Sequence, residues 1–171
     1  MKKQKGFSLI ELLIVVAIIL IIAAIAVPNL LRSRMAANEA SSAGSLRTIA
    51  TSNVTYSTTY GIGFSPTLIA LGCPTTGCTG TATSAEADLI DSALAAGTKS
   101  GYTFVYVGDP AGGSISTDPN QTYTVDGTPL SPNSSGVSAF CVDQSNVVRK
   151  DPVGTDPASN GIACDTAILP M

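Results

Sequence analysis

The fold of this chain is decided by residues 6–28, which read GFSLIELLIVVAIILIIAAIAVP. From Phe7 to Val27 the stretch contains 21 residues, of which only Glu11 is ionisable. A helix of that length spans roughly 31 Å, because each residue adds about 1.5 Å. The hydrocarbon core of a bilayer is about 30 Å thick. The stretch therefore predicts one membrane-spanning helix.

The residues that flank this span predict its orientation. Residues 1–6 contain Lys2, Lys3 and Lys5 and no acidic residue. Lysine-rich flanks remain on the cytoplasmic side of a membrane. No second apolar run of similar length follows. We therefore expect a single-span protein with a cytoplasmic N-terminus and an external C-terminal part.

An ordinary secretory signal is the alternative interpretation of this region. Such signals have a basic start, an apolar middle and a cleavage site of small residues, for which Ala24-Ile25-Ala26 qualifies. Cleavage there would remove the span. Glu11 interrupts the apolar region, however, and the run is long for a signal core. Both features favour a helix that remains part of the mature protein.

Glu11 needs a partner or a route to water. A carboxylate inside hydrocarbon is unfavourable, by about 2.5–3.5 kcal/mol at the middle of a span. One solution is a cation, and the free amine at the N-terminus of a neighbouring copy would supply it. The alternative is that the Glu11 side chain reaches the membrane interface and pairs with nothing.

Residues 6–40 resemble the N-terminal segment of type IV pilins and related pseudopilins. The likeness is carried by the short basic leader, Gly6 before Phe7, Glu11, and Pro28 just after the span; it is close over about the first 60 residues. It implies that prepilin peptidase removes residues 1–6 by cleaving between Gly6 and Phe7, and that the new Phe7 amine is N-methylated. It also implies that this amine meets Glu11 of an adjacent subunit during assembly.

The helix is expected to continue to about Tyr60. Residues 7–28 form the membrane-spanning half, which later becomes filament core, and residues 29–60 form an amphipathic half. Pro28 removes a helical hydrogen bond, so we expect a kink or local melting near Ala24 to Pro28. The apolar stripe of the second half recurs at steps of three and four, at Ala36, Ala40, Ala43, Leu46, Ala50 and Val54.

Residues 61–171 predict a globular head of the α+β class. Thr83-Ser84-Ala85-Glu86 matches a capping box, so a short helix is expected near 84–96. Residues rich in β-branched and aromatic side chains predict antiparallel strands near 101–107, 121–125 and 138–149, the second closed by Asp126-Gly127. The sheet should pack on the second half of the long helix, as in the pilin fold that the resemblance implies.

Four cysteines lie in the head, and an external location permits disulfides. Four cysteines allow three pairings. We favour Cys73–Cys78 and Cys141–Cys164, because each closes a local loop, and the second resembles the disulfide-bounded C-terminal region of many pilins. A zinc site built from the four cysteines is the alternative, although only one compact pair is present.

Charge and composition restrict the function. Removal of Lys2, Lys3 and Lys5 would leave six basic against twelve acidic side chains, a balance of −6, which argues against nucleic-acid binding. The arginines of the long helix, Arg32, Arg34 and Arg47, suit membrane-surface or interfacial contacts, with DNA contact a minor alternative. The sequence has no histidine, so we expect neither a Ser-His or Cys-His catalytic system nor a cofactor.

Two further side-chain sets have simpler interpretations. Calcium binding is conceivable at the loop aspartates Asp109, Asp118, Asp126 and Asp143, but the EF-hand spacing is absent, which favours ordinary turn residues. Tyr56 and Tyr60 stand one helical turn apart, which favours plain packing over an aromatic relay for electrons.

The sequence thus predicts a structural subunit that polymerises with itself into a type IV pilus filament. The resemblance implies an assembly ATPase, a membrane platform protein and an outer-membrane secretin as partners. Adhesion, twitching motility or DNA uptake would follow from the filament. Two alternatives stay open: a pseudopilin of a type II secretion system, and a minor adhesive subunit of a filament.

Overall fold

This computed structural model describes residues 8–73, 81–108, 121–152, 164 and 169–171. The chain divides into two compact units, Met1–Arg34 and Met35–Met171. Helix α1, Leu9–Tyr60, contributes to both of them. The expected leader, residues 1–6, and Phe7 lie outside the described residues.

The first unit exposes the apolar part of α1. Its most apolar 18-residue window has a mean hydropathy of 3.3, and none of that window is buried. Leu9 is 73% exposed and Ile25 is 65% exposed. Each Å² of apolar surface that is removed from water contributes about 25 cal/mol of favourable free energy. This surface therefore needs an apolar environment that the unit itself does not supply.

Pro28 lies inside α1, and the helix is continuous through it. The expected local melting between Ala24 and Pro28 is therefore not seen in this structure. Proline removes one backbone donor, but the neighbouring Asn29 adds a bond here, because its Nδ2 donates to Ile25 O at 3.1 Å. Ala26, Leu30 and Leu31, which lie close to Pro28, are good helix formers.

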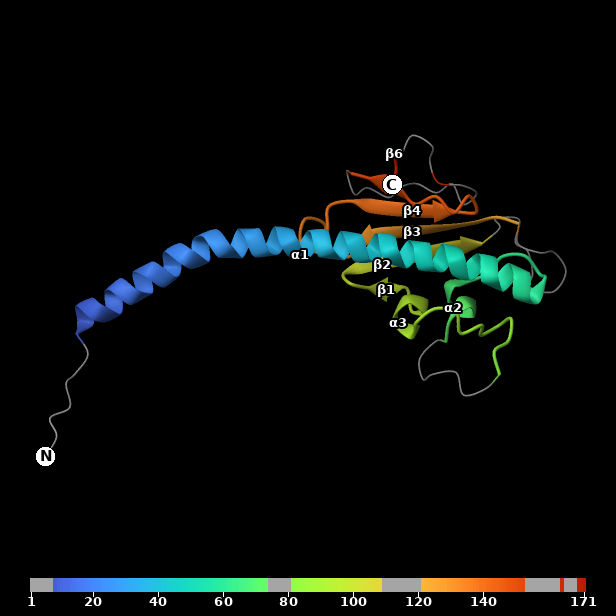
Figure 1. The fold of residues 1–171 in the computed structure, drawn as a ribbon, viewed down its shortest axis with the longest axis horizontal. Coiled ribbons are helices and arrows are strands. Elements are labelled where there is room, and N and C mark those ends of the chain that lie inside the picture. Colours follow the sequence, from blue (N-terminus) through green and yellow to red (C-terminus); the bar gives the residue numbers. More distant parts are fainter. Residues whose placement is uncertain (1–7, 74–80, 109–120, 153–163, 165–168) are drawn as a thin grey trace, which may run out of the picture. The chain divides into compact units, whose positions relative to one another are not determined.

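The second unit is an antiparallel sheet packed on the later half of α1 (Figure 1). Its short helices and strands follow in chain order: α2 Leu68–Leu71, α3 Ser92–Ala95, β1 Thr98–Lys99, β2 Tyr102–Gly108, β3 Tyr123–Pro129, β4 Ala139–Asp143, β5 Arg149–Asp151 and β6 Leu169–Pro170. Each strand pairs with the next, so the sheet order is β1-β2-β3-β4-β5-β6. This architecture confirms the predicted α+β pilin fold.

The prediction of a helix near 84–96 was mostly wrong, since only Ser92–Ala95 of this range is helical. Thr83 and Glu86 form a tight turn in which each backbone N–H donates to the other's carbonyl, at 3.0 and 3.1 Å. Asp88 has a φ of 52°, which a right-handed helix does not allow. The true N-cap is Asp91, whose Oδ1 accepts from Leu94 N at 3.0 Å.

The strand expected to close at Asp126-Gly127 continues through both residues. Gly127 pairs with Phe104 on β2 and with Phe140 on β4. Here α1 crosses the sheet closely, because a Cβ added to Gly127 would lie 3.0 Å from Ser42 Oγ. The glycine therefore allows α1 to approach the sheet closely, and it does not mark a turn. The other expected strands correspond to β2, and to β4 and β5 together; α2, β1 and β6 were not predicted.

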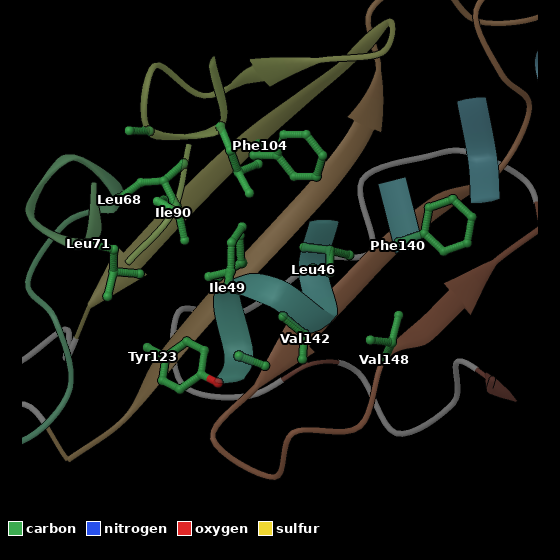
Figure 2. Close-up of a cluster of buried hydrophobic side chains, with 14 of the residues drawn as sticks. Leu46, Ile49, Leu68, Leu71, Ile90, Phe104, Tyr123, Phe140, Val142 and Val148 are labelled. Atoms are coloured by element: carbon green, nitrogen blue, oxygen red, sulfur yellow. The ribbon is translucent and has the colours of Figure 1, made fainter. Parts of the chain in front are cut away.

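The core lies between α1 and the inner face of the sheet (Figure 2). Leu46 and Ile49 of α1 are fully buried against Phe104, Tyr123 and Val142. The predicted stripe was partly wrong: Val54 is 42% exposed, whereas Ile49 and Tyr56, which do not belong to that stripe, are fully buried. The buried face of α1 also contains polar residues whose burial the sequence pattern did not indicate, Ser42, Ser45, Ser52 and Asn53.

Candidate processing and assembly site

The first turn of α1 contains Glu11, the residue singled out by the sequence. Ser8 precedes the helix, and its backbone N–H donates to Glu11 Oε2 at 2.9 Å. The first N–H groups of a helix have no partner within it, and a glutamate at the third helical position satisfies one of them by reaching back to the residue before the helix. In the isolated chain Glu11 therefore stabilises the start of its own helix.

This local role of Glu11 could have been found in the sequence. Ser8-Leu9-Ile10-Glu11 has the same spacing as Thr83-Ser84-Ala85-Glu86 and precedes a far longer apolar run. Gly6 and Phe7, the other residues expected to take part in processing and assembly, lie outside the described residues. The predicted contact between Glu11 and a neighbour's Phe7 amine therefore stays a prediction.

Glu39 fastens α1 to the sheet of the second unit. Its Oε1 accepts from the backbone N–H groups of Val137 and Ser138, at 3.0 and 3.1 Å, and its Oε2 lies 3.3 Å from Lys150 Nζ. Burial raises the pKa of Glu39, but the two backbone donors and Lys150 outweigh burial and hold the pKa below its ordinary value. Next to it, Asn38 Nδ2 donates to Ser135 O at 2.8 Å.

The predicted disulfide between Cys141 and Cys164 is confirmed, with the two Cα atoms 5.9 Å apart. It ties the C-terminal segment to the central strand β4, and it removes two thiolates from the alternative zinc site. Asp143 supports the same junction: its buried carboxylate accepts from Cys164 N at 3.1 Å and from Ser145 N at 2.9 Å. Cys73 is also disulfide-bonded, but its expected partner, Cys78, lies outside the described residues.

The aspartates considered for calcium binding are either buried in strands or lie outside the described residues. Asp126 and Asp143 are buried on β3 and β4 and not in loops, and Asp109 and Asp118 lie outside the described residues. Within the described parts of the chain, no group of three acidic, cysteine or histidine side chains could hold a metal.

Tyr56 and Tyr60 pack together with ring centroids 4.9 Å apart. The Tyr56 hydroxyl donates to Ser84 O at 2.7 Å. The first contact lies within α1 and the second joins α1 to the segment that follows α2, so both fit plain packing. The arginines Arg32, Arg34 and Arg47 are exposed on α1.

Comparison with known proteins supports the interpretation of the N-terminus. The family model described as the prokaryotic N-terminal methylation motif matches residues 1–27. The chain is 62% identical over 39 residues to the type IV wide pilus major component PilA4 of Thermus thermophilus. That match covers 23% of this chain and 30% of the relative's length. No solved structure matches the chain significantly.

The matched motif lies at the start of an exposed apolar helix, and the second half of that helix packs on an antiparallel sheet. The N-terminal segment of the chain is therefore similar to that of a type IV pilin. The motif and the helix fit a precursor that is anchored in a membrane and becomes part of an extracellular pilus filament.

Proposed function

We propose that this chain is the structural subunit of a type IV pilus filament. The observation that carries the proposal is the contrast between its two units. The second unit has a closed core, whereas the apolar residues from Leu9 to Val27 have no cover of their own. A bilayer provides that cover before assembly, and neighbouring helices provide it afterwards.

Cleavage of the leader would create the cationic amine that drives assembly. Prepilin peptidase would cleave between Gly6 and Phe7, and the Phe7 amine would be N-methylated and cationic. Once water is excluded from the helical bundle, that amine requires an anion, and Glu11 of an adjacent subunit supplies one. Breaking a buried ion pair costs about 3–5 kcal/mol, so the pair would fix the axial register between neighbouring helices.

The partners would be other copies of this chain, prepilin peptidase, and an assembly machine with an ATPase, a platform protein and a secretin. Adhesion, twitching motility or DNA uptake would be properties of the whole filament. The relative named above is described as a major pilus component, which favours a pilus over a secretion pseudopilus for this chain.

The proposal is tested on fibres sheared from the native cells. Mass spectrometry should find this chain as the main component, beginning with an N-methylated Phe7. Long surface fibres that contain the chain only in trace amounts would indicate a minor subunit. The absence of surface fibres would favour the secretion pseudopilin, and mature material that begins after Ala26 would contradict both.

A further inference from the structure

A hollow of about 340 Å³ opens on the second unit between α1 and the turn that links β4 to β5. It is lined by Arg47, Ala50, Thr51, Val54 and Asn146. Two of the polar groups are satisfied within the chain: Thr51 Oγ1 donates to Arg47 O at 2.9 Å, and Asn146 Oδ1 accepts from Tyr123 Oη at 3.2 Å. The Arg47 guanidinium is the ionic group of this lining.

Arg47 is exposed and makes no ion pair with any residue that the structure describes. The described lysines of the head differ, since Lys99 pairs with Asp91 and Lys150 with Glu39. A guanidinium beside apolar walls attracts a carboxylate more strongly than one in open water, because the walls lower the local dielectric constant. The occupant that suits this hollow is therefore acidic.

The head presents such a group between α2 and α3. Glu86 and Asp88 are exposed on either side of the buried Ala87. Backbone bonds hold this segment against α2, from Ala87 N to Ala70 O at 2.9 Å and from Leu89 N to Leu71 O at 2.7 Å. Glu86 and Asp88 form no ion pair within the described residues. The carboxylates thus stand on a fixed backbone, which reduces the entropy lost on binding.

The hollow and this acidic turn lie toward opposite edges of the sheet. Figure 1 shows α3 and β1 toward one edge of the sheet and β4 toward the other. The acidic turn precedes α3 and β1 in the chain, whereas the hollow borders the turn between β4 and β5. Two different surfaces that join copies head to tail generate an open array unless the rotation closes into a ring. We propose that the hollow around Arg47 receives the Glu86–Asp88 turn of a second copy. This inference rests on the proposed filament function.

Photo-crosslinking of the full chain in its native cells tests the contact directly. Thr51→p-benzoylphenylalanine places the probe inside the hollow, and Thr59→p-benzoylphenylalanine is a control at an exposed position of α1 outside the lining. We expect irradiation to give a covalent dimer from the Thr51 probe, with the crosslink on the peptide that contains residues 84–89. Crosslinks to other peptides, to another protein or to lipid alone would overturn the inference.

Charge reversal provides an independent test of the same contact. Arg47→Glu, and separately Glu86→Lys with Asp88→Lys, should each lower the Thr51 crosslink about tenfold, because like charges then face each other. The triple variant, which combines Arg47→Glu, Glu86→Lys and Asp88→Lys, should restore most of the Thr51 crosslink. Arg47→Lys, which keeps the positive charge, should retain the crosslink. An undiminished crosslink in Arg47→Glu, or a triple variant no better than its parts, would contradict the inference.

The two proposals fail differently. Abundant fibres made by an Arg47→Glu chain that gives no crosslink would overturn the docking contact and leave the filament function standing. A crosslink in cells whose fibres lack this chain would retain the contact between copies and overturn the filament function.

Discussion

Glu39 and Lys150 lie 111 residues apart in the sequence and meet at 3.3 Å across the junction of α1 with the sheet. The same carboxylate also accepts two backbone N–H groups of the segment before β4. One side chain thus joins the long helix, the approach to the central strand β4 and the strand β5. Because the Glu39 side chain is only 18% exposed, these bonds are partly shielded from water.

Loss of this carboxylate should weaken the head. Glu39→Ala leaves the N–H groups of Val137 and Ser138 without their acceptor, which should lower the free energy of unfolding by about 1–3 kcal/mol. Thermal denaturation of the full chain in detergent measures this. Glu86→Ala is the control, because Glu86 is exposed and its side chain has no hydrogen bond among the described residues; equal effects of both variants would contradict the role of Glu39.

The Glu39 contacts should also make stability depend on pH. The pKa of Glu39 is lower in the folded chain than its ordinary value of 4.5. Its contribution is therefore fully present above about pH 4.5 and is lost as the pH falls through the lower, folded pKa. Glu39→Gln should flatten the acid limb of a melting-temperature profile, and an unchanged acid limb would show that other carboxylates govern it.

The Cys141–Cys164 disulfide closes a separation of 23 residues. In the chain-entropy model a loop of that length stabilises the folded state by about 3 kcal/mol. The double change Cys141→Ser and Cys164→Ser should lower the unfolding free energy by roughly that amount, measured by denaturant titration. Asp143→Asn tests the neighbouring junction with the disulfide intact. A double variant as stable as the parent would show that the other contacts at this junction suffice.

The two faces of α1 in the head should respond differently to truncation. Leu46 and Ile49 are fully buried in the core, so Leu46→Ala or Ile49→Ala should cost about 2–5 kcal/mol. Val54 is 42% exposed on the same helix, and Val54→Ala should change stability by no more than about 0.5 kcal/mol. Similar losses at all three positions would mean that the buried face has been assigned wrongly.

Gly127 should tolerate no larger side chain. Its added Cβ would lie 3.0 Å from Ser42 Oγ and 3.3 Å from the Phe104 ring. Gly127→Val should therefore push α1 from the sheet and destabilise the head by about 1–3 kcal/mol. The double variant with Ser42→Gly should recover part of that loss. No recovery would place the strain elsewhere in β3.

Sequence patterns predicted the long-range plan of the chain but failed where tertiary contacts override local signals. The apolar run and the main strands were predictable, because each leaves a strong pattern of its own. The pairing of Cys141 with Cys164 was favoured among three possible connectivities, because it closes a local loop and resembles the pairing in many pilins, and the structure confirms it. The capping pattern at Thr83 was misleading, because the backbone after it bonds to α2 and Asp88 adopts a positive φ.

Gly127 was mistaken for a turn residue for a related reason, since its role is set by a helix far away in sequence. The contacts that Glu39 makes with the sheet left no local signal in the sequence. Its partners are 98 to 111 residues distant, and only the folded head brings them together. The bond between Ser8 and Glu11, by contrast, was visible in the sequence as a Ser-x-x-Glu spacing.

The central claim is that the charge of Glu11 drives assembly, beyond its local bond to Ser8. Glu11→Gln removes the charge yet keeps an oxygen that can accept from Ser8 N–H, whereas Glu11→Ala removes both. The decisive measurement is the rate of fibre formation by these chains, with cleavage after Gly6 verified by mass spectrometry. The account predicts that both variants polymerise at least about tenfold more slowly than the parent, because each strands a buried amine. A Glu11→Gln chain that polymerises at the parental rate while Glu11→Ala does not would show that helix capping matters and the ion pair does not.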